Sequence, residues 1–385
     1  MKLAVVGPTY PFRGGIALYS TLLVRALRER HQVDFFAFRR LYPRLLFPGS
    51  TDPDPSAVPL VEPCSPTLDG LDPATWFRTA KLIVSARPDL LVLQWWTAYW
   101  LPLYRTLAGR ARAAGVPVLT IVHQLVEPAS PNAERLLTRL ALRSSDGLLM
   151  PGPVEAELVR RWFPGRPVRQ GRLPAFPHCP GERPSRDEAR RALGVDPSAP
   201  LLLFFGFVRR YKGLRTLLQA LARVPEVRLL VAGKFWENER SYRERIRRLG
   251  LADRVSLVDR YVGNEEVARL FAAADALVLP YLAGGQSAVG VTALSFGLPV
   301  IATRIGGLEG LVADGETGLL VEPGSSDQLA HAIRRLFHEG LAAPMREAAA
   351  REGARRSWGS LTAVVEELAA ELIAGRATEA PHASR

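Results

Sequence analysis

Short apolar runs alternate with amphipathic stretches along the whole chain. In the first half, continuous apolar runs predict buried strands, and segments whose apolar positions recur once per helical turn predict helices. The predicted strands are residues 3–6, 33–38, 89–93, 118–122 and 147–150, and the predicted helices are residues 16–30, 74–86, 101–114, 132–143 and 154–162.

The second half repeats this alternation. Its predicted strands are residues 201–205, 228–232, 255–258, 276–279 and 300–302, and its predicted helices are residues 213–223, 240–249, 265–273, 289–296, 327–337 and 360–374. Parallel strands that are buried on both faces read as continuous apolar runs followed by helices. We therefore predict an α/β protein with two doubly wound, Rossmann-like domains.

A stretch rich in Pro, Gly and Arg separates the two halves. Residues 164–184 show little periodicity and are typical of a linker. The predicted domains are residues 1–175 and 185–358, with a C-terminal helix at residues 359–376 that packs back on the first domain. Two such domains are expected to face each other across a cleft, with ligands beyond the carboxyl ends of the strands.

Composition narrows the class of protein. The 385 residues are 48% hydrophobic and 23% charged, which is typical of a globular protein of two domains. No apolar run is long enough to span a membrane, and the apolar start is too short for a signal peptide. The two cysteines, Cys64 and Cys179, provide neither a disulfide framework nor a zinc cluster. We therefore expect a cytoplasmic protein.

The net charge favours anionic partners. The excess of Lys and Arg gives a formal charge of +12, which suits phosphates or an acidic membrane surface. The basic residues are scattered, and no nucleic-acid-binding motif is present, so nucleic acid is not a predicted partner.

Three cations precede a predicted helix in the second domain. Arg209, Arg210 and Lys212 lie between the strand at residues 201–205 and a helix that starts near Gly213. Positive charge is unfavourable at the start of a helix unless an anion binds there. The alternative is that all three side chains simply point into water.

Two glycine-rich turns could bring backbone amides close to phosphate. In one, Gly284 and Gly285 precede a predicted helix that Ser287 can cap. In the other, Gly14 and Gly15 precede the first helix. Each could equally be an ordinary turn. The turn at Gly14 and Gly15 lacks the G-x-G-x-x-G spacing, which argues against a dinucleotide-dependent oxidoreductase.

Three further features are ambiguous on sequence alone. His123 ends a strand at the edge where ligands bind, although a single histidine is often structural. The Asp-Pro-Asp at residues 52–54 matches a metal-binding D-x-D, but its Pro-rich surroundings indicate a chance match. The aromatic segment at residues 94–104 suits core packing, a sugar-stacking wall or a membrane interface.

The combination resembles the group 1 glycosyltransferases, the retaining, nucleotide-sugar-dependent family four with the GT-B fold. The resemblance rests on Phe-Gly-Leu-Pro-Val-Ile-Ala-Thr at 296–303, Gly-Gly at 306–307 and Asp-Gly-Glu-Thr-Gly-Leu-Leu-Val at 314–321. Arg13-Gly14-Gly15, His123 and Lys212-Gly213 also match the family. It implies transfer of a hexose from a UDP- or GDP-sugar to a glycan, a lipid or another glycoconjugate, as in polysaccharide biosynthesis. It also implies retention of configuration, no metal or other cofactor, and work in the cytoplasm or at the inner membrane face.

The sequence departs from the family at its acidic residues. The two glutamates expected in the donor site fall on Gly284 and Thr292, and the expected diphosphate arginine falls on Phe207, with Arg209 or Arg210 as substitutes. A subgroup with Gln-Ser in this loop also lacks the glutamates. An alternative is therefore a non-catalytic GT-B scaffold that binds nucleotide or a protein partner.

Applied residue by residue, the resemblance implies two sets of site residues. The catalytic set is His123, Lys212 and Arg209, with His123 orienting the sugar from the first domain. The donor-binding set is Arg210, Gly284, Gly285, Gln286, Ser287, Ala288, Val289, Thr292, Gly14 and Gly15.

Overall fold

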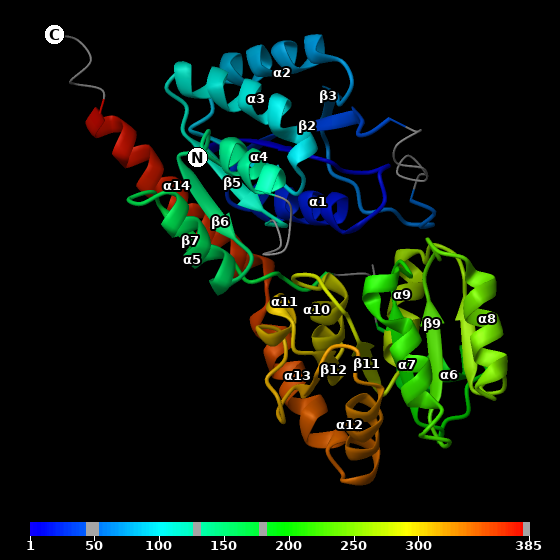
Figure 1. Cartoon of the computed structure of the whole chain (residues 1–385). Helices are drawn as coiled ribbons and strands as arrows, with labels where there is room; N and C mark the ends of the chain where they lie inside the picture. The colour runs from blue at the N-terminus through cyan, green and yellow to red at the C-terminus, as the bar shows by residue number, and fades with distance from the viewer. Residues whose placement is uncertain (44–53, 126–131, 177–182, 380–385) are drawn as a thin grey trace. The chain divides into compact units, whose positions relative to one another are not determined.

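The chain forms two compact units (Figure 1). The structure is a computed structural model that describes residues 1–43, 54–125, 132–176 and 183–379. Unit 1 comprises Met1–Asp54, Leu60–Arg172 and Trp358–Arg385, and unit 2 comprises Pro55–Pro59 and Leu173–Ser357. The C-terminal helix, which comes last in the sequence, thus belongs to the same unit as the first strand.

Unit 1 is built on a seven-stranded parallel sheet with the order β3-β2-β1-β4-β5-β6-β7. Its strands are β1 (Lys2–Gly7), β2 (Gln32–Arg40), β3 (Ser65–Asp69), β4 (Leu90–Trp95), β5 (Val118–Val122), β6 (Gly147–Met150) and β7 (Val168–Gln170). The apolar runs predicted as strands form the centre of the sheet, because both of its faces are covered by helices.

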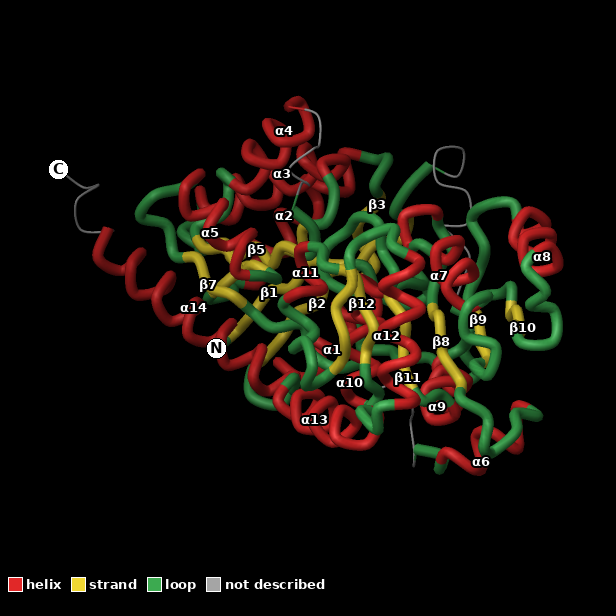
Figure 2. The backbone as a smooth tube through the Cα atoms, turned by 60° about the horizontal axis from the view of Figure 1, so that its bottom comes forward, coloured by secondary structure: helices red, strands yellow, loops and turns green. Residues whose placement is uncertain are grey.

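Six α-helices cover this sheet. They are α1 (Gly15–Arg28), α2 (Pro73–Ala86), α3 (Leu101–Ala113), α4 (Asn132–Leu142), α5 (Pro153–Trp162) and α14 (Trp358–Glu379). Helix α1 packs against α14, whereas α2 packs against α3 and α3 against α4 (Figures 1 and 2). Helices α1 and α14 therefore cover one face of the sheet, and α2, α3 and α4 cover the other. This follows because the crossovers are right-handed and the chain proceeds in opposite directions from β1 and from β4.

Unit 2 is built on a six-stranded parallel sheet with the order β10-β9-β8-β11-β12-β13. Its strands are β8 (Leu201–Phe205), β9 (Arg228–Ala232), β10 (Val255–Val258), β11 (Ala276–Leu279), β12 (Val300–Thr303) and β13 (Gly318–Val321). Its helices are α6 (Arg186–Leu193), α7 (Leu214–Leu221), α8 (Glu239–Arg248), α9 (Asn264–Ala273), α10 (Ala288–Ser295), α11 (Gly306–Glu309), α12 (Ser326–His338) and α13 (Ala342–Arg355).

All ten predicted strands are confirmed, and the structure adds elements that the apolar pattern missed. Edge strand β7 lies inside residues 164–184, so the prediction of a linker was wrong for residues 168–170. Cys179, in the same stretch, lies outside the described residues. Two 3₁₀ turns also occur, at Ala98–Trp100 and Arg210–Lys212.

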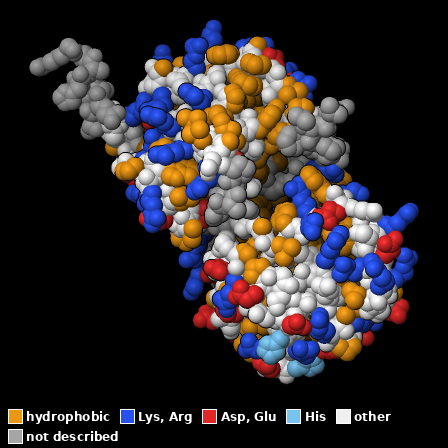
Figure 3. Space-filling model, viewed as in Figure 1, with side chains coloured by type: hydrophobic (Ala, Val, Ile, Leu, Met, Phe, Trp, Pro, Cys, Tyr) orange, Lys and Arg blue, Asp and Glu red, His pale blue; other side chains and the backbone are white. Residues whose placement is uncertain are grey.

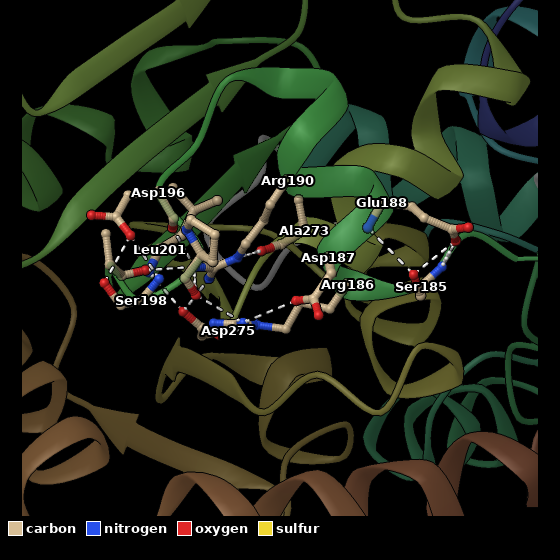
Figure 4. Close-up of polar contacts among 12 residues, drawn as sticks. Ser185, Arg186, Asp187, Glu188, Arg190, Asp196, Ser198, Leu201, Ala273 and Asp275 are labelled. Carbon is tan, nitrogen blue, oxygen red and sulfur yellow. Dashed lines mark hydrogen bonds and ion pairs between the residues drawn. The ribbon is translucent and has the colours of Figure 1, made fainter.

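A buried arginine ties α6 to the amino ends of two strands in unit 2 (Figure 4). Arg190 is 0% exposed and donates to Asp275 at 2.7 Å and to the carbonyl oxygens of Asp196, Pro197, Ala199 and Ala273 at 2.8–2.9 Å. Asp275 also accepts from the backbone N–H of Leu201, the first residue of β8. Because each partner is matched, the buried charge is well solvated by the protein.

The aromatic segment at residues 94–104 belongs largely to the core of unit 1. Trp95, Trp100 and Tyr104 are buried, and their rings pack against one another and against Trp96 and Tyr99. The core interpretation is therefore confirmed for these three residues, which are not available to a membrane. Within the described residues, no helix is both long and apolar enough to cross a bilayer.

Candidate functional site

Each unit has a topological switch point, the place where a crevice opens at the carboxyl edge of an open α/β sheet. In unit 2 the chain proceeds outward from β8 to β9 and β10 on one side, and from β11 to β12 and β13 on the other. The switch point therefore lies between β8 and β11. In unit 1 it lies between β1 and β4 for the same reason.

Lys212 lies at the switch point of unit 2. Gly206 directly follows β8, and a Cβ at this residue would lie 3.0 Å from Nζ of Lys212. Tyr281 lies two residues after β11, and its ring centre is 5.5 Å from the same Nζ. Burial lowers the pKa of Lys212, and the nearby charge of Arg209 lowers it further. A desolvated ammonium beside a second cation is typical of a site completed by an anion.

The backbone holds Lys212 in place. Gly213 has φ of 72°, and a Cβ at this residue would lie 1.8 Å from the carbonyl oxygen of Pro280. Only glycine allows this conformation and this approach without strain. The N–H of Leu282 donates to the carbonyl of Tyr211 at 2.6 Å, so the turn after β8 is fixed to the loop after β11.

The two arginines of the motif differ in their surroundings. The guanidinium of Arg209 stacks on the half-exposed Trp236, with its Cζ 3.7 Å from the ring centre. Such stacking holds the charge in place at little cost in hydration. Arg210 is exposed on the 3₁₀ turn. Phe207, where the family resemblance places an arginine, packs on Trp236 instead, with ring centres 5.2 Å apart.

The loop after β11 leads directly into helix α10. Ser287 accepts a hydrogen bond from the N–H of Gly290 at 3.2 Å, so its predicted role as the cap of this helix is confirmed. Ser287 also hydrogen-bonds to the buried Tyr281, whose pKa burial raises to about 12. The first bond along the helix joins the N–H of Val291 to the carbonyl of Ser287, which leaves the N–H groups of Ala288 and Val289 ahead of the helical ladder.

Gly284, Gly285 and Gln286 lie against the start of α11. A Cβ at Gly307 would stand 2.5 Å from the backbone nitrogen of Gln286 and 2.6 Å from the carbonyl carbon of Gly285. Gly284, which is partly exposed, has φ of 132°, a conformation that residues with side chains rarely adopt. A glutamate at this position would therefore require a different loop conformation.

Thr292 is buried within helix α10. It is 1% exposed, and its hydroxyl donates to the carbonyl of Ala288 at 2.9 Å within helix α10. Its hydroxyl proton is used inside the helix, and the predicted role of Thr292 in donor binding stays a prediction.

His123 lies one residue beyond β5 in unit 1. Its Nε2 is 3.0 Å from Oε1 of Gln94, and its ring makes a T-shaped contact with the ring of Tyr19, with ring centres 4.5 Å apart. Burial lowers the pKa of His123 to about 3, so the imidazole is neutral at ordinary pH.

Gly14 and Gly15 begin helix α1 in the same unit. Gly14 is the residue before the helix and has φ of 116°, and a Cβ at either position would meet nothing within 4 Å. The space beside both backbones is therefore open, as the approach of a ligand requires. Residues 52 and 53 of the D-x-D match lie outside the described part of the chain. Among the described residues, no group of three or more His, Cys, Asp and Glu side chains could hold a metal ion.

Sequence reasoning missed three residues that shape these sites. Gln94, Tyr281 and Trp236 hold His123, Lys212 and Arg209, respectively. Gln94 offered one usable signal, a lone amide at the end of an otherwise apolar strand.

Two family models match the chain. A model described as "Glycosyl transferases group 1" matches residues 199–339, which include Lys212 and the loop after β11. A model described as "Glycosyl transferase 4-like domain" matches residues 14–175, which include His123. Together the two matches cover most of the chain and fall one on each unit.

Curated relatives are similar to about half of the chain. A D-inositol 3-phosphate glycosyltransferase of Corynebacterium urealyticum is 34% identical over 200 residues, which are 49% of this chain and 47% of that protein. A protein of the same name from Mycobacterium sp. (strain KMS) is 34% identical over 180 residues, 46% of this chain and 40% of that protein. The chain therefore spans less than half the length of these relatives.

Solved structures share the fold across almost the whole chain. HepE from Anabaena, determined in complex with UDP, superposes with a TM-score of 0.74 at 20% identity and covers 97% of this chain and 100% of its own. Sucrose-phosphate synthase from Thermosynechococcus elongatus superposes with a TM-score of 0.70 at 21% identity, over 97% and 99% of the two chains. The predicted GT-B fold is thereby confirmed.

Proposed function

Because the chain belongs to the group 1 glycosyltransferases, we propose that it transfers a hexose from a UDP- or GDP-sugar to a glycan or lipid-linked acceptor with retention of configuration. The proposed donor is supported by the UDP and UDP-glucose bound to HepE, a protein of the same fold. The carboxyl edge of unit 2 supports it independently.

In this proposal unit 2 holds the diphosphate of the donor. Lys212 supplies a desolvated positive charge, Arg209 a second one, and the N–H groups of Ala288 and Val289 supply hydrogen-bond donors at the positive end of α10. Arg210, Gly284, Gly285 and Gln286 line the approach to these groups, while Ser287 orients the start of the helix.

The reaction breaks one bond at the sugar and forms another. The bond between C1 of the sugar and the diphosphate oxygen breaks, and that oxygen takes up the negative charge. The acceptor hydroxyl bonds to C1, and its proton passes to the departing diphosphate. Charge on the leaving group is therefore what the protein must stabilise, and Lys212 and Arg209 can do so without a carboxylate or a metal ion.

Unit 1 contributes His123 and the start of α1. Gln94 contacts Nε2 of the neutral ring, so Nδ1 is the ring nitrogen that is left to bond with a sugar hydroxyl. Gly14 and Gly15 provide an open approach to the first turn of α1.

The observation that carries this proposal is that two cations, Lys212 and Arg209, lie close together at a switch point that lacks the family's two glutamates. The test is sugar-nucleotide hydrolysis and transfer, with UDP- and GDP-hexoses and with glycan and lipid acceptors. We expect turnover with at least one donor and a loss of at least tenfold in Lys212→Ala. Arg247→Met, an exposed cation on α8, is the matched control.

The second candidate function is a scaffold that binds nucleotide without turnover, and it is motivated by Gly284 at the position of a family glutamate. Nucleotide binding with no turnover on any donor would favour the scaffold. If turnover is found, the anomeric configuration of the product tests retention. Unchanged turnover in a chelator tests the prediction that no metal is needed, and cell fractionation tests the predicted cytoplasmic location.

A further inference from the structure

The outer face of helices α2, α3 and α4 in unit 1 combines exposed apolar and basic side chains (Figure 3). These helices form one layer, since α2 packs on α3 and α3 on α4. We call the solvent side of this layer the α2–α4 face and define it by Phe77, Leu82, Leu136 and Leu137 with the Lys and Arg residues of the same helices.

The apolar side chains of the face are strongly exposed. Phe77 is 51% exposed and Leu82 48% on α2, and Leu136 is 58% and Leu137 39% on α4. On α2 they alternate with Arg78 and Lys81 along one exposed stripe. The solvent side of a helix is normally polar, so two helices of one layer that both expose large apolar groups form an unusual surface.

The charge of the face is almost entirely positive. Of the eight charged side chains in the three helices, seven are Lys or Arg and Glu134 is the single acidic one; of the seven, Arg112 pairs with Asp146, which lies outside these helices. Arg78, Lys81 and Arg105 are exposed and make no ion pair within the described part of the chain. Their charge is therefore available to an external anionic surface.

Other exposed helices lack this combination. Helix α8 is also rich in arginine but carries two glutamates and exposes no large apolar side chain. Helix α5 exposes Val154 at 73%, yet its two arginines, Arg160 and Arg161, both pair with Glu157. The abundance of arginine in the sequence does not by itself explain the α2–α4 face.

We propose that the α2–α4 face docks unit 1 on a bilayer that contains anionic lipid. Exposed Leu and Phe side chains can insert at the level of the headgroups, while Lys and Arg reach the lipid phosphates with their long side chains. A duplex nucleic acid would satisfy the charge but would leave the leucines in water. The inference rests on this surface alone and does not depend on the proposed transferase activity.

Flotation with lipid vesicles tests the proposal. The full chain is mixed with vesicles of phosphatidylcholine alone or with about 30% phosphatidylglycerol. We expect the chain to float with the anionic vesicles and to float much less with the neutral ones or at high salt. The double variant Leu82→Ser with Leu136→Ser should partition at least tenfold less, and Val154→Ser, outside the face, should behave as wild type.

The other outcomes are equally decisive. Equal flotation of the double variant and wild type, or no flotation on anionic vesicles, would overturn the proposal, as would salt-dependent binding to polyglutamate without binding to vesicles. Donor hydrolysis without vesicles is measured in parallel. Hydrolysis retained in a double variant that no longer floats supports the docking face, whereas normal flotation without any hydrolysis contradicts only the transferase.

Discussion

Nε2 of His123 lies 3.0 Å from Oε1 of Gln94, a side chain that is fully buried in the sheet of unit 1. Oγ of Ser20 lies 3.0 Å from the same oxygen and 2.9 Å from the carbonyl oxygen of Ile16. Gln94 thus occupies one of the two ring nitrogens through which His123 could bond to a ligand.

Replacing Gln94 by glutamate should change the dependence of turnover on pH. A carboxylate beside Nε2 favours the imidazolium and raises the pKa of His123 from about 3. If the neutral ring is required, Gln94→Glu should lose activity progressively as the pH is lowered from about 7 to 5. The wild-type ring remains neutral over this interval and should contribute no such loss. Parallel pH profiles of the two proteins would argue against a role for His123.

Gly7→Ala should disturb the contact between Gln94 and His123, because the added methyl group would collide with Gln94. A Cβ at residue 7 would lie 2.5 Å from Nε2 of Gln94 and 2.7 Å from Oγ of Ser20. Overpacking of this kind costs about 1–3 kcal/mol of the free energy of unfolding, and we expect turnover to fall further than stability alone explains. Gly109→Ala on α3, where a Cβ would meet nothing within 4 Å, is the control and should fold at least as stably as wild type. Denaturant titration and activity at saturating donor measure the two effects.

Lys212→Met should stabilise the ligand-free protein while weakening donor binding. The pKa of Lys212 is lowered, so the folded state disfavours its charge, and removing that charge should raise stability by about 1 kcal/mol, or about 2–4 °C in Tm. The folded protein bears the full free-energy cost of the Lys212 charge at any pH below the pKa that Lys212 has in the folded state. This cost is relieved as the pH rises through that pKa towards 10.5, the ordinary pKa of lysine. The advantage of the variant should therefore shrink at high pH, and a constant difference from neutral pH to about pH 10 would contradict it.

Arg190→Met should be among the most destabilising single changes in unit 2. It would leave Asp275 with one fewer cation and would remove one hydrogen-bond donor from each of the carbonyl oxygens of Asp196, Pro197, Ala199 and Ala273 (Figure 4). Breaking a buried pair in this way typically costs about 3–5 kcal/mol. Thermal unfolding should show a fall in Tm of about 10 °C, whereas Arg191→Met, which is exposed on the same helix, should change Tm little. Equal effects of the two variants would show that the network is not important for stability.

The apolar pattern was sufficient for the central strands and most helices but not for elements that lack a large apolar face. Strand β3 (Ser65–Asp69) contains a proline and little apolar surface, and β7 has a single buried residue. Helix α13 buries only Met345, Ala349 and Gly353, and Gly353 would place a Cβ 2.4 Å from the carbonyl of Leu294. Its packing depends on a small residue that allows close contact, which hydrophobic periodicity does not reveal.

The candidate site was predictable where the chemistry resides in the residue type and its place at a strand end. Lys212, Arg209 and His123 were identified on that basis. Their partners were not, because Trp236 and Tyr281 follow other strands and meet the cations only when the sheet is assembled. Sequence position also did not show that the hydroxyl of Thr292 bonds within its own helix.

Titration calorimetry of the full chain with UDP and GDP tests the central claim most directly. If Lys212 and the start of α10 hold a diphosphate, wild type should bind at least one of the two nucleotides. Lys212→Met should bind it at least tenfold more weakly, a difference of about 1.4 kcal/mol, while Arg247→Met should match wild type. An absence of heat with both nucleotides, or equal affinity of wild type and Lys212→Met, would contradict the account.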